Sequence, residues 1–500
     1  MTLSLILEMA CSAGPDTVLV GSRDGGTTAG ALHRQAARGA RLLRETGARS
    51  VAYLGVSGPA FPSVLFAAAA AGLPFTPLNF RLSAEQLADL VARLDRPVLV
   101  VDRAYRTAVE SLGVGMLDSE TWVDDAERAQ PAEPVPVPDD APAVVLYTSG
   151  TTSAPKGALL RHSHLLSYVL QTVEFASAPE ESAILVSVPP YHVAGVGTVL
   201  TNIYAGRRIV YLPHFTPPEW LRLARSEAVT HAMVVPTMLA RIVDEVGDSS
   251  VDLPALRAIA YGGARMPRPV LEAALRSFPR VDFTNAYGLT ETSSTIAVLG
   301  PDDHRAALES PDPQTRARLG SAGRLVPGVE AQIRAEDGTV LGPGEHGELW
   351  VRGPQVSGEY AGAGAALDPG GWFHTRDLAS VDADGFLFVI GRSDDTIIKG
   401  GENIAPAEIE EVLIRHSGVK DVAVTGVPDN EWGSRIVAVV VPVPGARPAA
   451  EELRDWVRTR LRGSRTPDEV RFSTELPYTP TGKLLRRRLR DDLVAGAITN

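Results

Sequence analysis

The sequence predicts an α/β protein with a large N-terminal domain of layered α/β subdomains plus a β-rich module, followed by a small α+β C-terminal domain. Three observations lead to this prediction. Short runs of Val, Ile and Leu alternate with helical patterns through most of the 500 residues. After Gly323, alternating strands are separated by Gly-centred turns, and helices and strands mix again near the C-terminus. We expect the boundary near Asp394, which gives domains 1–393 and 394–500.

Each expected strand is a short apolar run, and each expected helix has apolar residues at helical spacing. In the large domain the expected strands are 51–56, 97–101, 144–148, 184–188, 208–212, 232–235, 256–261 and 281–284. The expected helices there are the N-terminal stretch, 30–45, 83–93, 217–226, 237–246 and 267–277. The Pro-rich, acidic stretch 129–143 is expected to be an extended connector. In the small domain we expect helices 406–416 and 450–462 and strands 422–425 and 436–441.

Composition and charge exclude several classes of protein. Hydrophobic residues make up 44% and charged residues 22%, as in globular proteins rather than disordered or collagenous ones. The net charge of -12 argues against binding along a nucleic-acid backbone. The single cysteine, Cys11, excludes an intrachain disulfide and a Cys-rich zinc site. No apolar run reaches the roughly 18–20 residues that span a bilayer, and the N-terminus lacks the basic segment of a signal peptide. We therefore expect a soluble, cytoplasmic protein.

Lysine is rare in this chain. Of 48 basic residues only four are lysine, namely Lys156, Lys399, Lys420 and Lys483. Arginine does not replace lysine where a compact ammonium must act as a point charge on phosphate. The four lysines are therefore candidates for such positions, and the alternative is that each survives by chance.

The first motif is "LYTSGTTSAPKGALL" at Leu146–Leu160, an apolar strand that runs into a loop of hydroxyls, glycine and lysine. Glycine lets backbone N–H groups approach a phosphate, hydroxyls donate to it, and lysine supplies charge. The spacing differs from a Walker A loop, because Pro155 precedes the lysine. The alternative is a polar surface loop. The residues that we expect to bind phosphate are Thr148, Ser149, Gly150, Thr151, Thr152 and Lys156.

The second motif is "NAYGLTET" at Asn285–Thr292, which is expected to follow a strand as a tight turn. Tyr287 can stack on a purine, and Thr290 can donate to a phosphate. Glu291 can hold Mg²⁺, which prefers a carboxylate together with phosphate oxygens. The alternative is a turn that contains a core tyrosine.

Two further motifs lie toward the C-terminus. Asp377 can accept hydrogen bonds from ribose hydroxyls, and Arg392 can approach the same sugar, although such pairs often only tie loops together. The run 399–402 is a glycine-containing loop before a helix. Lys483 lies on a Pro/Thr/Gly loop just before a basic helix, so its ammonium is a candidate for chemistry, whereas the arginines after it fit a solvated face.

Together, in this order and spacing, the four motifs resemble the adenylate-forming superfamily of acyl-CoA synthetases, adenylation domains and luciferases. The similarity covers nearly the whole chain and is greatest to stand-alone fatty acyl-CoA and aryl-CoA ligases. The resemblance implies ATP, Mg²⁺ and CoA as ligands and a mobile small domain. It implies an adenine slot and a nucleotide site that add the following residues to those above: Gly262, Gly263, Ala264, Asn285, Ala286, Tyr287 and Gly288.

The resemblance also implies roles in catalysis. Lys483 would bridge the α-phosphate and the attacking carboxylate, and Asp394 would be the hinge of the small domain. The implied catalytic residues are Lys483, His192, Thr290 and Glu291, with Glu291 on the metal. The acyl pocket would include His192, Val193, Gly195, Tyr261 and Gly288. The CoA tunnel would include Lys399, Gly400, Gly401 and Glu402. A satisfied loop histidine is the plainer interpretation of His192.

Two positions depart from the family pattern, since Ser153 and Arg376 both stand where the family usually has glycine. The expected reaction is ATP-dependent adenylation of a carboxylic acid, followed by thioester formation with CoA. No pocket candidate is acidic, which argues against an amino acid, and Ala286 rather than arginine precedes Tyr287, which weakens a small dicarboxylate unless Arg265 supplies the cation. We expect a neutral fatty or aromatic acid. A carrier-protein thiol as acceptor, a homodimer, and a non-catalytic nucleotide-binding protein remain alternatives.

Overall fold

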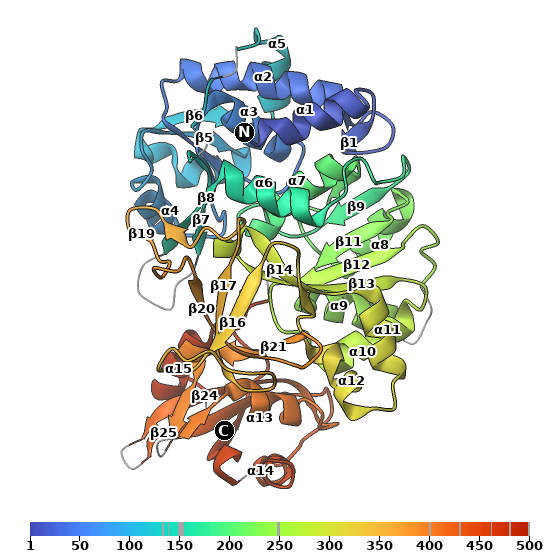
Figure 1. The fold of residues 1–500 in the computed structure, drawn as a ribbon, viewed down its shortest axis with the longest axis vertical. Helices are drawn as coiled ribbons and strands as arrows, with labels where there is room; N and C mark the ends of the chain where they lie inside the picture. Colours follow the sequence, from blue (N-terminus) through green and yellow to red (C-terminus); the bar gives the residue numbers. More distant parts are fainter. Residues whose placement is uncertain are drawn as a thin grey trace.

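The computed structural model describes residues 1–132, 135–138, 140–148, 155–247, 251–399, 402–429, 432–461, 463–479 and 482–498. A large N-terminal domain of mixed sheets and a smaller C-terminal α+β domain lie at opposite ends of the long axis (Figure 1). This confirms the predicted α/β class. No helix within these described ranges is long and apolar enough to cross a bilayer.

Among the described residues, a nine-stranded sheet has the order β15-β14-β13-β12-β11-β9-β10-β1-β2. Its central strands are parallel and largely buried, which explains their nearly continuous apolar runs. The strands are β1 (Val18–Val20), β2 (Thr27–Thr28), β9 (Ala183–Val186), β10 (Arg208–Tyr211), β11 (His231–Val234), β12 (Ala258–Gly262), β13 (Asp282–Leu289), β14 (Ser294–Leu299) and β15 (Arg324–Leu325).

An eight-stranded sheet, again counted over the described part of the chain, has the order β19-β18-β8-β7-β4-β3-β5-β6. Two of its strands, β18 and β19, come from a segment about 200 residues after β8. They pair next to β8 and form the edge of the sheet on that side. The strands are β3 (Ser50–Leu54), β4 (Phe75–Pro77), β5 (Pro97–Val101), β6 (Gly115–Asp118), β7 (Pro142–Thr148), β8 (Lys156–Arg161), β18 (Glu359–Tyr360) and β19 (Gly364–Ala365).

The helices of the large domain cover these two sheets and lie between them (Figure 1). Several begin at residues that favour helix starts: Thr28 accepts from the Ala31 N–H, Ser83 and Gln86 form a capping box, and five helices in the described part of this domain carry proline at the first or second position. The helices are α1 (Ser4–Ala13), α2 (Ala29–Glu45), α3 (Ala60–Ala71), α4 (Ala84–Val91), α5 (Trp122–Arg128), α6 (His162–Thr172), α7 (Val193–Ala205), α8 (Pro217–Ser226), α9 (Pro236–Val246), α10 (Arg268–Ser277), α11 (Pro301–Glu309) and α12 (Pro313–Ala317).

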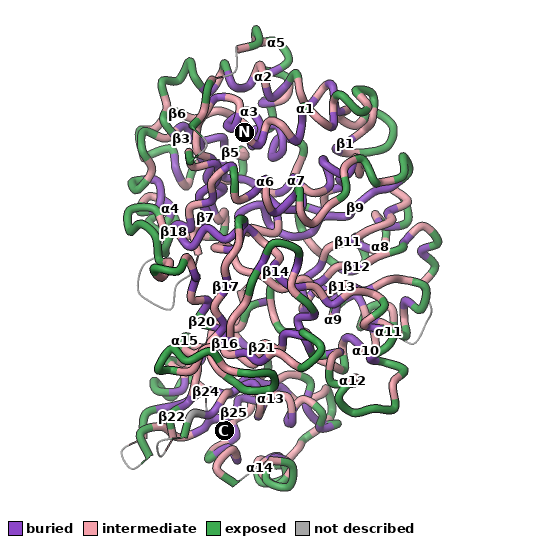
Figure 2. Tube along the Cα trace, in the orientation of Figure 1, coloured by how far each residue is buried: buried purple, intermediate pink, exposed green. Residues whose placement is uncertain are grey.

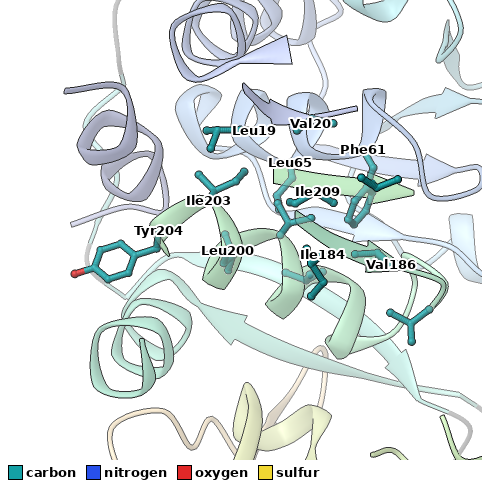
Figure 3. Close-up of a cluster of buried hydrophobic side chains, with 14 of the residues drawn as sticks. Leu19, Val20, Phe61, Leu65, Ile184, Val186, Leu200, Ile203, Tyr204 and Ile209 are labelled. Carbon is teal, nitrogen blue, oxygen red and sulfur yellow. The ribbon is translucent and has the colours of Figure 1, made fainter. Parts of the chain in front are cut away.

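The largest core cluster joins the two sheets through α3 and α7. Figure 3 shows Phe61 and Leu65 of α3 beside Leu200 of α7, with strand residues of the nine-stranded sheet against them. Each of these three side chains is at most 1% exposed. Burial of this apolar area stabilises the relative position of the layers. Figure 2 shows the same pattern along the chain, with buried segments inside and exposed loops at the rim.

A third, four-stranded sheet lies between the large sheets and the small domain (Figure 1), and it is the predicted β-rich module. Its strands are β16 (Glu330–Arg334), β17 (Gly347–Arg352), β20 (Phe373–Val381) and β21 (Leu387–Arg392). The small domain has its own core around a three-stranded sheet. That sheet contains β24 (Val419–Asp429), β25 (Gly433–Pro442) and β26 (Glu469–Phe472), and β22 (Ile397–Lys399) pairs separately with β23 (Glu402–Ile404). The helices of the small domain are α13 (Pro406–Leu413), α14 (Ala450–Arg458) and α15 (Arg486–Val494).

Several expected boundaries differ from the structure: α13 ends at Leu413 and α14 at Arg458, before the expected ends, and β24 and β25 extend beyond theirs. The difference at β13 bears on the site. The sequence predicts a strand over 281–284 followed by a tight turn, whereas β13 continues to Leu289. The extension pairs with β14, and a bulge between Tyr287 and Gly288 brings the backbones so close that a Cβ on Gly288 would lie 1.7 Å from the Ser294 carbonyl oxygen. The glycine therefore serves a close strand approach, not a turn.

Candidate functional site

The strand ends that carry the predicted adenine slot lie side by side. β12 and β13 run parallel, with Gly262 paired to Ala286. A Cβ on Gly262 would approach the Ala286 carbonyl oxygen to 2.3 Å, so glycine permits the close pairing. Gly263 follows with φ of +82°, in the left-handed region, and leads to Ala264. Ligands of open α/β sheets bind beyond the carboxyl ends of the strands, which is where these residues lie.

Tyr287, Asp377 and Arg392 form one hydrogen-bonded group. The β20–β21 hairpin pairs Asp377 directly with Arg392, whose Nη1 lies 3.0 Å from Oδ1 of Asp377. The Tyr287 hydroxyl donates to Oδ2 of the same carboxylate. Burial raises the pKa of Asp377, while the charge of Arg392 and the bond from Tyr287 oppose that shift. The pair is therefore a buried ion pair held by an additional hydroxyl donor.

This carboxylate still has acceptor capacity. A carboxylate offers about four lone-pair sites, and Arg392 and Tyr287 each use one oxygen of Asp377. The remaining sites can accept hydrogen bonds from the two hydroxyls of a ribose. The geometry brings together the two residues that the sequence predicted for the sugar, and it places the predicted purine-stacking tyrosine beside them.

Lys483 lies on a turn that rests against the large domain. The Thr479 N–H donates to the Lys483 carbonyl at 2.7 Å, and the Lys483 N–H donates to the Thr479 hydroxyl at 2.9 Å. Gly482 has φ of +75°, and a Cβ there would lie 2.7 Å from Oγ1 of Thr237 in α9. The Lys483 side chain is exposed, and its charge is the smallest of the influences that oppose the burial-driven rise in the pKa of Asp377. The turn that carries this lysine contacts α9 of the large domain.

The phosphate side begins at the paired ends of β7 and β8. Thr148 faces Lys156 across this hairpin, and the Thr148 hydroxyl donates to the Lys156 carbonyl at 3.3 Å. The Lys156 ammonium lies 5.5 Å from the centre of the Tyr360 ring. The predicted phosphate residues Ser149, Gly150, Thr151 and Thr152, together with Ser153, lie outside the described residues.

Glu291 and Thr290 lie in the 3₁₀ turn Thr290–Thr292 that follows β13. Oε1 of Glu291 accepts a hydrogen bond from the Tyr360 hydroxyl at 2.7 Å. Burial raises the pKa of Tyr360, and the charge of Glu291 raises it further, so this hydroxyl keeps its proton and donates. Within the described ranges no three His, Cys, Asp or Glu side chains are grouped as metal ligands. One carboxylate beside a phosphate loop fits Mg²⁺, which is usually held by one or two carboxylates plus substrate phosphates.

Asn285, another predicted nucleotide residue, is engaged by the protein. Its Nδ2 donates to the Ser321 carbonyl oxygen at 3.0 Å. This bond fixes the loop before β15 against β13. Its assignment to the nucleotide stays a prediction.

The predicted hinge lies in the 3₁₀ turn Ser393–Asp395, between β21 and β22. Arg376, one of the two departures from the family pattern, has φ of +62°, a conformation that favours glycine. Its Nη1 lies 3.6 Å from Oδ2 of Asp394, and its carbonyl oxygen accepts from the Ser393 hydroxyl at 3.2 Å. Arg376 therefore contacts the turn that leads to the small domain.

The predicted acyl side is centred on the start of α7. His192 precedes the helix, and Val193 and Gly195 lie in its first turn. Burial lowers the pKa of His192 to about 4, and the charge of Arg81 adds to this, so the imidazole is neutral at pH 7. Tyr261 is buried in the large core, where its hydroxyl shares a 2.8 Å hydrogen bond with Nε2 of His304. Its role in the acyl pocket, like that of Gly288, stays a prediction.

The described residues of the predicted CoA tunnel are ion-paired within the small domain. Nζ of Lys399 lies 2.5 and 2.7 Å from the two carboxylate oxygens of Asp468. Glu402 lies 2.6 Å from Nη1 of Arg465. Gly400 and Gly401 lie outside the described residues. These residues stay predicted for the tunnel.

Sequence reasoning missed two contacts of this site. Tyr360 contacts both Lys156 and Glu291, but it belongs to none of the four motifs. It lies near them because β18 pairs with β8. Arg265 crosses the domain interface: its Nη2 lies 2.5 Å from Oε2 of Glu411, and its Nη1 donates to the Ala407 carbonyl at 3.2 Å. Its position next to the "YGGA" turn was the available indication of a role near the site.

Comparison with known proteins identifies the class. The family of AMP-binding enzymes matches residues 7–361, and the C-terminal domain of AMP-binding enzymes matches residues 408–483. The chain therefore belongs to the AMP-binding enzymes. Within this family it is an adenylate-forming acyl-CoA synthetase, as the motifs predicted.

Individual relatives match over nearly their full length. A feruloyl-CoA synthase from Amycolatopsis sp. is 39% identical over 480 residues, which cover 94% of this chain and 94% of that protein. The fatty acid–[acyl-carrier-protein] ligase ScoC from Streptomyces coeruleorubidus is 32% identical over 479 residues, 92% of this chain and 90% of that protein. The structure of o-succinylbenzoate CoA synthetase from Bacillus subtilis with its acyl-adenylate intermediate has a TM-score of 0.84 at 29% identity, over 97% of this chain and 98% of that chain.

Proposed function

We propose that this protein ligates a neutral aromatic carboxylic acid to CoA in two steps, with ATP cleaved to AMP and pyrophosphate. The observation that carries the proposal is geometric: Asp377 pairs with Arg392 at 3.0 Å and accepts from the Tyr287 hydroxyl, and the turn that carries Lys483 rests against α9 of the large domain. Three residues predicted separately from the sequence, Tyr287, Asp377 and Arg392, thus form one group, and Lys156 and Glu291 lie in the same large domain.

In the first step a carboxylate oxygen attacks the α-phosphorus of ATP, and the bond to the β-phosphate breaks to release pyrophosphate. Both reactants are anions, so the site must supply positive charge as they approach. Lys156 would hold the β- and γ-phosphates, and Lys483 would contact the α-phosphate and the carboxylate. When bound, Mg²⁺ neutralises phosphate charge in this region. Glu291 would orient it, and Asp377 would position the ribose.

In the second step the CoA sulfur, having lost its proton, attacks the carbonyl carbon of the acyl-adenylate, and AMP leaves. In the proposed adenylating arrangement Lys483 would occupy the side of the adenylate that the thiol must reach, so the small domain would have to turn away. Asp394 is the proposed hinge, because it lies in the short turn between the last strand of the module and β22. The neutral imidazole of His192 would line the approach to the carbonyl without adding charge.

Two observations support a neutral aromatic acid. The guanidinium of Arg265, the cation nearest the adenine slot in the sequence, is engaged by Glu411 and the Ala407 carbonyl. It is thus directed at the small domain and not at a second carboxylate of the substrate. The similarity to a feruloyl-CoA synthase supports an aromatic acid over a fatty one.

The test is a panel of aromatic, fatty and dicarboxylic acids in which pyrophosphate release is measured with and without CoA. We expect release with a neutral aromatic acid and ATP, and a thioester after CoA is added. Lys483→Ala should slow pyrophosphate release about 100- to 1,000-fold and leave the thiolation of supplied acyl-adenylate within about threefold of the wild type. Lys420→Ala, a lysine change elsewhere in the small domain, is the matched control. Equal loss of both half-reactions in Lys483→Ala would contradict the assignment.

A carrier-protein thiol is the second candidate acceptor, because the ligase ScoC is 32% identical. Thioester formation with free CoA and no carrier distinguishes the two acceptors. We place the enzyme in the cytoplasm, where ATP and CoA are supplied, and a homodimer stays a proposal for solution measurement of mass.

A further inference from the structure

Tyr360 lies between Lys156, the proposed phosphate ligand, and Glu291, the proposed magnesium ligand. It ends the short strand β18, which pairs antiparallel with β8 through Ala158. The next residue continues the contact, since the Ala361 N–H donates to the Gly157 carbonyl at 2.8 Å. A segment far along the chain is thus attached directly to the strand that begins with Lys156.

The two ends of the Tyr360 side chain contact different charged groups. Its hydroxyl donates to Oε1 of Glu291 at 2.7 Å. Its ring lies beneath the ammonium of Lys156, 5.5 Å from ring centre to Nζ, within the range of a cation–π interaction. One side chain therefore connects the proposed magnesium carboxylate with the proposed phosphate lysine.

The segment that carries Tyr360 is fixed on both sides. The N–H groups of Ser357 and Gly358 donate to the Glu291 carbonyl at 2.8 and 3.2 Å. Arg161 of β8 holds both carboxylate oxygens of Glu359, with Nη2 2.9 Å from Oε1 and Nε 3.1 Å from Oε2. Such bidentate pairs fix geometry as well as charge. Both the backbone of Glu291 and its carboxylate are thereby held by the residues around Tyr360.

The chemistry of tyrosine suits this position. A direct pair between Lys156 and Glu291 would use up the charge that each needs for its ligand, and within the described residues no such pair forms. The ring face attracts the ammonium without occupying its N–H donors, which stay available for phosphate oxygens. The hydroxyl holds one carboxylate oxygen, and the other oxygen remains as a ligand.

We propose that Tyr360 is a positioning residue that holds Lys156 and Glu291 apart and aims each at its ligand, the polyphosphate and the divalent cation. This inference rests on the proposed function in assigning those ligands. It predicts that the hydroxyl and the ring serve separate purposes, so that two substitutions at this one position give different results.

The test measures nucleotide binding by calorimetry with no acid and no CoA present. Tyr360→Phe removes the hydroxyl only. We expect it to weaken ATP binding about fivefold to tenfold in excess Mg²⁺, and to leave ATP binding in EDTA unchanged. Tyr360→Leu also removes the ring, so it should weaken ATP binding in EDTA as well. AMP, which lacks the β- and γ-phosphates, should bind both variants like the wild type.

Tyr204→Phe, which removes a hydroxyl at the far end of α7, is the matched control. It should bind ATP in Mg²⁺, ATP in EDTA and AMP like the wild type. Equal ATP affinity of Tyr360→Phe and wild type in Mg²⁺ would overturn the proposal. Equal weakening of ATP and AMP in both variants would assign Tyr360 a purely structural role and also overturn it. Because the measurement uses nucleotide and Mg²⁺ alone, its outcome is independent of whether the acid panel yields a thioester.

Discussion

The two sides of the proposed nucleotide site are built differently. On the phosphate side, Lys156, Tyr360 and Glu291 all belong to the large domain, and strand pairing fixes them. On the ribose side, Asp377 and Arg392 are also fixed by a hairpin, but the groups around them, Lys483 and the turn at Asp394, belong to the small domain or lead to it.

This difference separates binding from reaction. The described groups on the phosphate side all belong to the large domain, so we expect their geometry not to depend on where the small domain lies. We expect the ribose side to gain or lose the Lys483 charge with the position of the small domain. The proposed two-step reaction needs both properties, because the nucleotide would have to stay bound while the lysine proposed for the first step moves away.

The largest expected effect comes from fixing the hinge. Asp394→Pro should keep the adenylating arrangement, because a 3₁₀ turn has φ of about −50 to −70° and proline has about −65°. It should prevent the turn of the small domain and slow thioester formation by roughly 100-fold, with pyrophosphate release within about threefold of wild type. The two half-reactions are measured separately.

Asp394→Ala is the control for this change, since it removes the contact with Arg376 but leaves the backbone free to rotate. It should affect both steps by less than about threefold. An unaffected overall rate in Asp394→Pro would remove the hinge from the mechanism.

The next effect compares the two sides directly. Asp377→Asn should weaken the binding of AMP and of ATP alike, about tenfold or more, because both nucleotides carry the ribose. Lys156→Ala should weaken ATP binding by a similar factor and leave AMP binding unchanged, because AMP lacks the β- and γ-phosphates. Calorimetric titration of both nucleotides into both variants checks this, and a loss of AMP affinity in Lys156→Ala would contradict the division of the site.

A smaller effect should follow from freeing the domain interface. Arg265 and Glu411 are 46% and 41% exposed, so their pair is worth at most about 1 kcal/mol. Arg265→Ala should slow adenylation about twofold to threefold, without slowing thiolation, and 0.5 M salt should reduce the difference. Arg415→Ala is the matched control, because Arg415 contacts the same Glu411 from within the small domain. Equal slowing of adenylation by Arg265→Ala and Arg415→Ala would show that the contact between Arg265 and Glu411 does not affect the rate.

The last prediction concerns stability against pH and should leave both sides of the site unchanged. The pKa of His192 is about 4 in the folded protein, below its ordinary value of 6.5. Between these values the unfolded chain binds a proton that the folded protein does not, so stability is lost as pH falls from 6.5 toward 4. Between pH 7 and 5 the free energy of unfolding should fall by about 2 kcal/mol less in His192→Gln than in wild type. Denaturant unfolding at both pH values checks this, and parallel losses would contradict the neutral, half-buried histidine.

Much of the fold follows from local patterns. β5 and α8 match the expected ranges, and the buried parallel strands are recognisable because they are continuously apolar. Asp377 and Arg392 were assigned to one sugar from the sequence, and the short hairpin between them brings them together.

The rest depends on contacts that local patterns do not encode. Gly288 resembles a turn residue, but its purpose is the close approach of β14. Tyr360 and Glu291 are 69 residues apart, and only the pairing of β18 with β8 places them together. Arg376 departs from the family glycine, and its contact with Asp394 becomes visible only when the hairpin and the following turn are in place.

The most direct test of the whole account is a crystal structure with an ATP analogue and the acid substrate in the adenylating arrangement. The account predicts that Nζ of Lys483 lies about 2.7–2.9 Å from an oxygen of the α-phosphate or of the carboxylate. An ammonium group in bulk solvent, remote from the α-phosphorus, would contradict it.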